Sequence, residues 1–377
     1  MEKNPLRIII SGGGTGGHIF PAISIANALR ELRPDADILF VGAQGRMEME
    51  RVPQAGYRIE GLPVVGLKRK LSLSNITFVF KLMSSLLKAR RIVRRFKPQV
   101  AVGVGGYASG PTLKAAQRMG LPTLLQEQNS FAGVTNRLLA QKAQRICVAY
   151  SGMERYFPAD KLMLTGNPVR QDLEPLSTTR AEALQHFDIP THHRVLLVLG
   201  GSLGARTINH SLLDGLQLLA QQPRLTVLWQ TGAHYLDEVQ QAMASGPKAE
   251  NIRVMGFVNR MDMAYAAADA VVSRAGAGTI SELCLVAKPS ILVPSPNVAE
   301  DHQTHNARAL ADRGAAIMVA DADAPKQLVQ RAIELMNDDA QRSKLAHNAA
   351  KLAMPHSART IAQQVLELCQ PTKYSEE

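Results

Sequence analysis

The amino-acid sequence contains one arrangement twice: an apolar run of strand length, then a glycine-rich loop, then a helical pattern. Residues 6–11 lead into the glycine cluster at 12–17, and residues 194–199 lead into a second cluster at 200–204. Strands that are apolar throughout and separated by helical patterns indicate parallel sheets covered by helices on both faces. The sequence therefore predicts an α/β protein of two doubly wound, Rossmann-like domains that face a cleft.

Length and composition agree with two globular domains. The chain has 377 residues, which is longer than a single hydrophobic core usually spans. With 46% hydrophobic and 20% charged residues, its composition is that of a globular and not a disordered protein. Its three cysteines are far apart and odd in number, which argues against a disulfide framework or a zinc site. The first residues lack a signal-peptide pattern, and no apolar run approaches the ~18–20 residues that span a bilayer. We therefore expect neither a secreted nor an integral membrane protein.

The domain boundary is predicted in the proline- and polar-rich segment 165–191. We expect residues 1–168 to form a first domain and residues 169–352 a second. Residues 353–377 are expected to contain a last amphipathic helix, over about 357–369. We expect this helix to pack back on the first domain. Further strands are predicted at 38–42, 100–104, 123–125, 145–148, 226–229, 252–254, 270–272 and 290–293.

The net charge of +11 is concentrated in one stretch, because residues 61–126 contain 12 basic side chains and no acidic one. A helix predicted over 74–96 alternates apolar residues with lysine and arginine, which is typical of a surface that docks on anionic lipid headgroups. To this surface we assign Lys68, Arg69, Lys70, Ile76, Phe80 and Lys81. One alternative is a buried helix with a solvated basic face. The other is nucleic-acid binding, but the sequence has no zinc-finger, RNP or helix-turn-helix signature that would support it.

The first glycine cluster, 12–17, contains G-x-G-x-x-G between a strand and a helix, where backbone amides can approach a phosphate or sugar oxygen. A nicotinamide or flavin dinucleotide would also require an acidic residue at the end of the second strand to hold its ribose. That strand ends in Val41-Gly42-Ala43-Gln44, so a dinucleotide cofactor is disfavoured. His18 directly follows the cluster, and an imidazole at a helix start suits a general base.

Two further loops, 103–111 and 200–205, are also candidate anion cradles, although glycines there would equally serve a tight turn. The segment 273–282 follows a strand and opens a helix. Thr279 and Glu282 have the T-x-x-E spacing of a capping box, which predicts that Thr279 caps this helix. The functional alternative is a Glu282 carboxylate that accepts the ribose hydroxyls of a nucleotide.

Together these stretches resemble the MurG family, the bacterial glycosyltransferases that complete the lipid-linked peptidoglycan precursor. The resemblance spans nearly the whole chain, and its motifs occur in the family's order. They are residues 13–22, 103–111, 127–130, 165–170, 200–206, 274–282 and 301–303.

The resemblance implies a GT-B fold and an inverting hexosyltransferase of peptidoglycan synthesis, and hence a role in cell shape and division. N-acetylglucosamine would pass from UDP-N-acetylglucosamine to the 4-hydroxyl of undecaprenyl-diphospho-muramoyl-pentapeptide, converting lipid I to lipid II. The protein would lie on the cytoplasmic face of the bacterial plasma membrane, where it could contact cell-wall and division proteins. Alternatives are another GT-B lipid glycosyltransferase, a sugar-nucleotide epimerase, or a non-enzymatic basic binding module, which would leave the glycine loops unexplained.

The resemblance also assigns site residues. His18 and Glu127 would face the acceptor, where the base must act, with Gly105, Gly106 and Tyr107 on the same side. The donor would be contacted by Thr15, Gly16, Gly17, Asn129, Arg170, Ser202, Val258, Ala277, Gly278, Thr279, Glu282 and Gln303. Some members have a bulky apolar residue where this chain has Gly278 and a glutamine where it has His302.

No cofactor and no metal are expected. The D-x-D segments 35–37 and 321–323 lie outside the glycine motifs, so neither is a convincing metal-binding motif. The leaving UDP would instead be stabilised by helix N-termini, by Ser202 and by nearby basic side chains.

Overall fold

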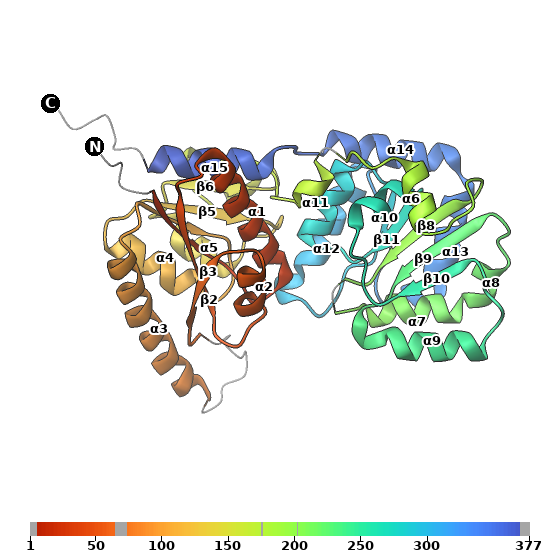
Figure 1. The fold of residues 1–377 in the computed structure, drawn as a ribbon, viewed down its shortest axis with the longest axis horizontal. Coiled ribbons are helices and arrows are strands. Elements are labelled where there is room, and N and C mark those ends of the chain that lie inside the picture. Colours follow the sequence, from red (N-terminus) through yellow and green to blue (C-terminus); the bar gives the residue numbers. More distant parts are fainter. Residues whose placement is uncertain (1–5, 65–73, 175, 202, 370–377) are drawn as a thin grey trace. The chain divides into compact units, whose positions relative to one another are not determined.

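The computed structural model describes residues 6–64, 74–174, 176–201 and 203–369 (Figure 1). The chain divides into two compact units. Unit 1 comprises Met1–Arg170 with His356–Glu377, and unit 2 comprises Gln171–Pro355. Each unit is built on one wholly parallel sheet with helices on both faces, which confirms the prediction of two Rossmann-like domains.

The sheet of unit 1 has seven strands in the order β3-β2-β1-β4-β5-β6-β7. They are β1 (Arg7–Ser11), β2 (Asp37–Ala43), β3 (Arg58–Leu62), β4 (Val100–Gly103), β5 (Thr123–Glu127), β6 (Arg145–Val148) and β7 (Leu162–Leu164). The strand order reverses direction between β1 and β4. The carboxyl ends of these two strands form the switch point where open α/β sheets bind their ligands.

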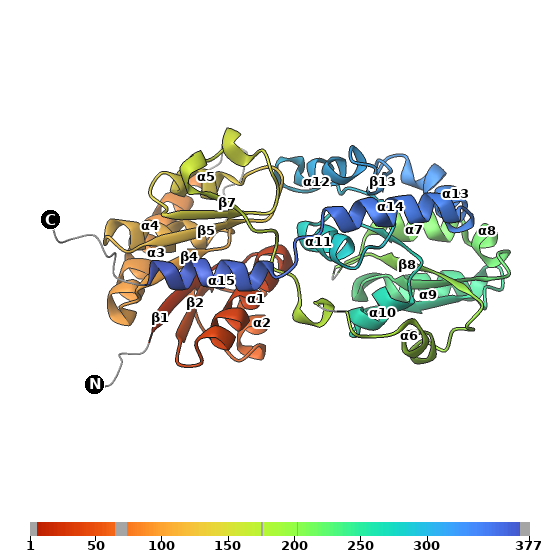
Figure 2. The same ribbon diagram turned by 90° about the horizontal axis from the view of Figure 1, so that it is seen from above.

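Among the described residues of unit 1, six α-helices cover this sheet. They are α1 (Gly16–Leu32), α2 (Glu48–Gln54), α3 (Ser74–Phe96), α4 (Ser109–Arg118), α5 (Val134–Ala140) and α15 (Ser357–Leu368), with 3-10 turns η1 (Met153–Arg155) and η2 (Ala159–Lys161). α3 has the bounds that the sequence predicts. α15 lies along α1 (Figure 2), and its Ile361, Ala362 and Val365 join the same buried core as Ile25 and Leu29. The last helix is therefore part of the core of unit 1.

The sheet of unit 2 has six strands in the order β10-β9-β8-β11-β12-β13, so its switch point lies between β8 and β11. The strands are β8 (Arg194–Leu199), β9 (Leu225–Gln230), β10 (Ile252–Met255), β11 (Ala270–Ser273), β12 (Ser290–Leu292) and β13 (Ile317–Met318). The α-helices are α6 (Arg180–His186), α7 (Arg206–Asp214), α8 (Leu216–Ala220), α9 (Leu236–Ser245), α10 (Met261–Ala267), α11 (Ala277–Leu285), α12 (His302–Ala311), α13 (Ala324–Asn337) and α14 (Asp339–Lys351). The 3-10 turns are η3 (Gln171–Leu173), η4 (Ala233–Tyr235) and η5 (Ala299–Asp301).

Three strands, β3, β7 and β13, were not predicted from the sequence, and all three lie at sheet edges. An edge strand pairs on one side only, so it need not be apolar throughout. In β3 the exposed Arg58 and the partly exposed Glu60 interrupt the apolar pattern, while β7 and β13 have only three and two residues.

Candidate active site

The topology of unit 1 brings two of the sequence motifs together. The 12–17 loop follows β1, and the 103–107 segment follows β4. β1 and β4 are neighbours, with Ser11 of β1 paired with Gly103 of β4. Both motifs therefore lie side by side at the switch point, together with His18 in the first turn of α1.

These two loops are packed directly on each other, and glycine is required where they meet. A Cβ added to Gly106 would lie 2.1 Å from the carbonyl oxygen of Gly13, and one added to Gly105 would lie 3.2 Å from Cε1 of His18. Both glycines also have positive φ angles. The Gly105–Gly106 turn is thus the surface against which the first loop and the His18 ring rest. Tyr107, beside it, is 54% exposed.

In the first glycine cluster, one of the amides that were expected to approach a phosphate already has a partner within the protein. The backbone N–H of Gly14 donates to Oε2 of Glu48 at 3.0 Å, so a resident carboxylate already occupies this amide. Thr15 is the N-cap of α1 without a side-chain capping bond, and Gly16 and Gly17 form its first turn. The donor contacts assigned to Thr15, Gly16 and Gly17 stay predictions.

Glu127, the last residue of β5, is a buried carboxylate that organises the loop following it. Its Oε1 accepts the backbone N–H of Asn129 at 3.1 Å, while Oε2 accepts the N–H of Gly133 at 3.0 Å and Nδ2 of Asn136 at 2.9 Å. Burial raises the pKa of the Glu127 carboxyl, and these hydrogen bonds offset part of that rise. This geometry fixes the position of Asn129, and a contact between Glu127 and the acceptor stays a prediction.

In unit 2 the donor-side motifs also gather at the switch point. Leu199, at the end of β8, pairs with Ser273 at the end of β11. The 200–205 loop and the start of α11 therefore emerge at the same edge of the sheet. Ser202, which was assigned to the donor, lies outside the described residues.

The prediction that Thr279 caps the helix beside this loop is wrong. α11 begins at Ala277 with Gly276 as its N-cap, whose φ of −67° and ψ of 142° are extended. Thr279 and Glu282 consequently lie inside the helix, with Ala277 and Gly278 in its first turn. Glu282 is partly exposed, and its Oε2 accepts the phenol O–H of Tyr265 at 2.9 Å. The capping explanation of Glu282 is removed, and ribose binding stays a prediction.

The remaining donor-side residues are spread over both units. Val258 is buried in the loop that follows β10, and Arg170 is the last residue of the first segment of unit 1. Gln303, in α12, accepts the backbone N–H of Ser295 through Oε1 at 2.9 Å. This bond ties α12 to the loop after β12, which emerges next to the loop after β11.

Three of the four D-x-D carboxylates are paired with arginines. Asp321 is paired with Arg274, at the start of the 274–282 motif. Its Oδ2 also accepts a hydrogen bond from the hydroxyl of Thr207 at 3.0 Å. Asp35 and Asp37 are paired with Arg33 and Arg58. Within the described ranges, no three histidine, cysteine or acidic side chains form a group that could hold a metal ion.

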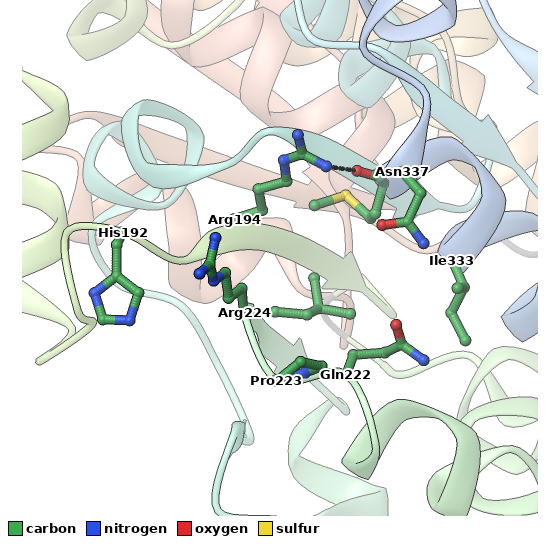
Figure 3. Close-up of a pocket in the computed structure, with 9 residues that line it drawn as sticks. His192, Arg194, Gln222, Pro223, Arg224, Ile333 and Asn337 are labelled. Carbon is green, nitrogen blue, oxygen red and sulfur yellow. Dashed lines mark hydrogen bonds between the residues drawn. The ribbon is translucent and has the colours of Figure 1, made fainter.

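A cavity of about 400 Å³ in unit 2 lies away from this site (Figure 3). Its lining includes Arg194 and Leu225, the first residues of β8 and β9, so it opens at the amino ends of the strands. Arg194 donates to the carbonyl oxygen of Met336 at 2.7 Å (Figure 3). None of the predicted site residues lines this cavity.

The basic stretch forms part of an exposed helix face. Phe80, Met83 and Leu87 are exposed, and their spacing places them on one side of α3. Arg91 and Arg94 extend this exposed side towards the end of the helix. The opposite side, with Ala89, Ile92 and Val93, is buried. Lys81 is also exposed, whereas Lys68, Arg69 and Lys70 and the side chain of Ile76 lie outside what the structure describes. Among the helices as far as they are described, none has the length and apolarity that crossing a bilayer requires.

Sequence reasoning missed three residues that organise the site: Glu48, Tyr265 and Asn136. Each forms a hydrogen bond with a site segment of another element: Glu48 with Gly14, Tyr265 with Glu282 and Asn136 with Glu127. These partners are 34, 17 and 9 residues apart in the sequence. A signal existed only for Glu48, which is the first acidic residue after the second strand.

Two parallel, doubly wound sheets, each with glycine motifs at its switch point, are the arrangement of the GT-B fold that glycosyltransferases use. The chain matches the glycosyltransferase family 28 N-terminal domain over residues 8–148 and the family 28 C-terminal domain over residues 195–365. A crystal structure of Acinetobacter baumannii MurG has a TM-score of 0.78 and 29% sequence identity, covering 96% of this chain and 100% of that one.

Two relatives bear the name UDP-N-acetylglucosamine--N-acetylmuramyl-(pentapeptide) pyrophosphoryl-undecaprenol N-acetylglucosamine transferase. The protein of Bacteroides fragilis is 59% identical over 369 residues, which cover 98% of this chain and 97% of the relative. The protein of Bacteroides thetaiotaomicron is 58% identical over 370 residues, which cover 98% of this chain and 99% of the relative. The chain therefore belongs to the MurG family of N-acetylglucosamine transferases, within glycosyltransferase family 28.

Proposed function

We infer that this protein transfers N-acetylglucosamine from UDP-N-acetylglucosamine to undecaprenyl-diphospho-muramoyl-pentapeptide, converting lipid I to lipid II in peptidoglycan synthesis. The observation that carries this inference is the near full-length identity of 58–59% to transferases named for that reaction. The site geometry agrees with it, because each unit brings two of the motifs together at a switch point. At this level of identity, the epimerase, the other lipid glycosyltransferases and the non-enzymatic binding module have nothing specific in their favour.

In the proposed mechanism, unit 1 binds the acceptor. His18 removes the proton from the muramic 4-hydroxyl as this oxygen attacks the anomeric carbon, so the configuration at that carbon inverts. The ring of His18 rests on Gly105, which limits its motion and favours one orientation towards the reacting hydroxyl. Tyr107, exposed beside it, offers an aromatic face to the acceptor sugar.

Unit 2 binds the donor in this mechanism. Glu282, oriented by Tyr265, accepts the ribose hydroxyls, and the first turn of α11 lies beside the diphosphate. N–H groups at helix starts stabilise the negative charge that develops on the leaving UDP. Arg274, which precedes this turn, is paired with Asp321 and donates to the carbonyl oxygen of Val293 at 3.1 Å, so these contacts hold the loop after β11 in place.

The exposed face of α3 is proposed to attach the protein to the cytoplasmic face of the plasma membrane. Phe80, Met83 and Leu87 would enter the headgroup region, and Lys81, Arg91 and Arg94 would meet anionic lipid. This location supplies the lipid-linked acceptor directly. The proposal extends to contacts with cell-wall and division proteins at the same membrane surface.

Purified protein incubated with radiolabelled UDP-N-acetylglucosamine and lipid I tests the function. Label should move into the lipid fraction, and UDP should be released in equal amount. A chelator should leave the rate unchanged, since neither D-x-D segment lies in a glycine motif. Label that stays in water-soluble sugar would refute the proposal.

A further inference from the structure

Glu48 is a buried carboxylate that the mechanism above does not use. It is the first residue of α2 and has no exposed surface. Its Oε1 accepts the backbone N–H of Ala43 at 2.9 Å, and its Oε2 accepts that of Gly14 at 3.0 Å. One side chain thus joins the end of β2 to the glycine loop that follows β1.

Two glycines from separate segments make room for this carboxylate. A Cβ added to Gly13 would lie 2.2 Å from Oε1 of Glu48, and one added to Gly42 would lie 2.6 Å from its Cγ. Removing a carboxylate from water is costly, and an apolar side chain would fill such a space at lower cost. The arrangement therefore serves a purpose other than filling a core.

The loop that Glu48 holds leads directly to the histidine. Gly14 precedes Thr15, whose carbonyl oxygen accepts the backbone N–H of His18 at 3.1 Å. On the other side, Gly13 rests on Gly106 and the His18 ring rests on Gly105. The position of His18 is consequently determined by a loop held between the Glu48 carboxylate and the Gly105–Gly106 turn.

Resting on the function proposed above, we propose that Glu48 is a positioning residue for the transfer reaction. Its carboxylate fixes the 12–17 loop so that His18 meets the acceptor hydroxyl in a reactive orientation. The same hydrogen bond occupies the Gly14 amide, so any phosphate contact of this loop would be made by its other amides.

Glu48→Gln tests the proposal, because it keeps the side-chain shape but turns an NH2 group towards one of two backbone N–H donors. kcat, counted per UDP-binding site to correct for any unfolded fraction, should fall about ten- to hundredfold. KM for UDP-N-acetylglucosamine should change less than about threefold, and the acid limb of the kcat/KM pH profile should move. Glu50→Gln, on the exposed side of the same helix, is the matched control and should behave as wild type.

A role in stability alone would lower the number of UDP-binding sites without changing kcat per site or the pH profile, and that outcome would overturn the proposal. Gly42→Ala provides a second variant, since the added methyl group displaces Glu48 and leaves its charge in place. In both variants the side-chain NMR resonances of His18 should shift, while in Glu50→Gln they should not. Unshifted resonances would overturn the positioning role, and this readout holds even if the wild-type protein forms no lipid II.

Discussion

The phenol of Tyr265, in α10, donates a 2.9 Å hydrogen bond to the Glu282 carboxylate in α11. Tyr265 is completely buried, whereas Glu282 is partly exposed. A buried aromatic ring that holds one carboxylate oxygen fixes the orientation of the whole carboxylate. If Glu282 binds the ribose as proposed, its carboxylate is already oriented by Tyr265 before the ligand binds.

Glu282→Ala should weaken UDP binding at least about tenfold, because hydrogen bonds from the ribose hydroxyls to a charged group are lost. Isothermal calorimetry measures this directly. Glu334→Ala, an exposed glutamate of α13, is the control and should bind UDP normally. Since Glu282 does not cap α11, unchanged affinity in Glu282→Ala would leave this residue without the proposed role.

His18→Ala should lower kcat by roughly 10²- to 10⁴-fold, the usual contribution of a general base, with UDP affinity little changed. Steady-state kinetics with lipid I and calorimetry with UDP separate the two effects. The control is His347→Ala, an exposed histidine of unit 2. Near-normal turnover in the His18 variant would assign the base to another group.

The membrane surface can be tested with three charge removals, Lys81→Gln, Arg91→Gln and Arg94→Gln. Each basic side chain near an anionic surface contributes about 1 kcal/mol, so together they should weaken binding to anionic vesicles about a hundredfold. UDP affinity should not change. The matched control removes three exposed lysines of unit 2, Lys326, Lys344 and Lys351. Equal loss of vesicle binding in both triple variants would mean that net charge, and not the α3 face, is recognised.

Asp262 predicts how stability depends on pH. Hydrogen bonds from Arg260 hold the pKa of the Asp262 carboxyl well below its usual range, and Oγ1 of Thr178 also donates to it. A lowered folded-state pKa stabilises the protein above the unfolded-state pKa of about 4, and this contribution is lost as the pH falls further. Asp262→Asn should therefore lower the free energy of unfolding at pH 7 by about 1–3 kcal/mol.

Urea unfolding at pH 7, 5 and 3 checks this, with the exposed Asp214→Asn as the control. The difference between wild type and Asp262→Asn should be nearly equal at pH 7 and 5 and smaller at pH 3. A difference that grew towards low pH would contradict the assignment.

Much of the site was predictable because parallel strands bring their carboxyl ends to one edge. Once 6–11 and 100–104 are recognised as parallel strands of one sheet, the glycine loops after them are expected at the same edge. The same holds for the 200–205 loop and the start of α11. That the loops lie side by side also depends on the strand order, which makes β1 a neighbour of β4 and β8 a neighbour of β11.

What could not be predicted depends on contacts between distant elements. Glu48 is the first acidic residue after the second strand, but that position does not indicate that its carboxylate reaches Gly14 once α2 has folded back against the sheet. The start of α11 was misplaced because Gly276 and Thr279 are both acceptable N-caps, and the extended backbone at Gly276 decides between them. The edge strands were missed because half-exposed strands lack the continuous apolar pattern.

The most direct test of the central claim is the structure of the product formed from UDP-N-acetylglucosamine and lipid I. Mass spectrometry should show a lipid that has gained one N-acetylhexosamine, and NMR should show a β linkage to the muramic 4-hydroxyl. Free N-acetylglucosamine, an epimerised sugar nucleotide or an α-linked product would contradict the account.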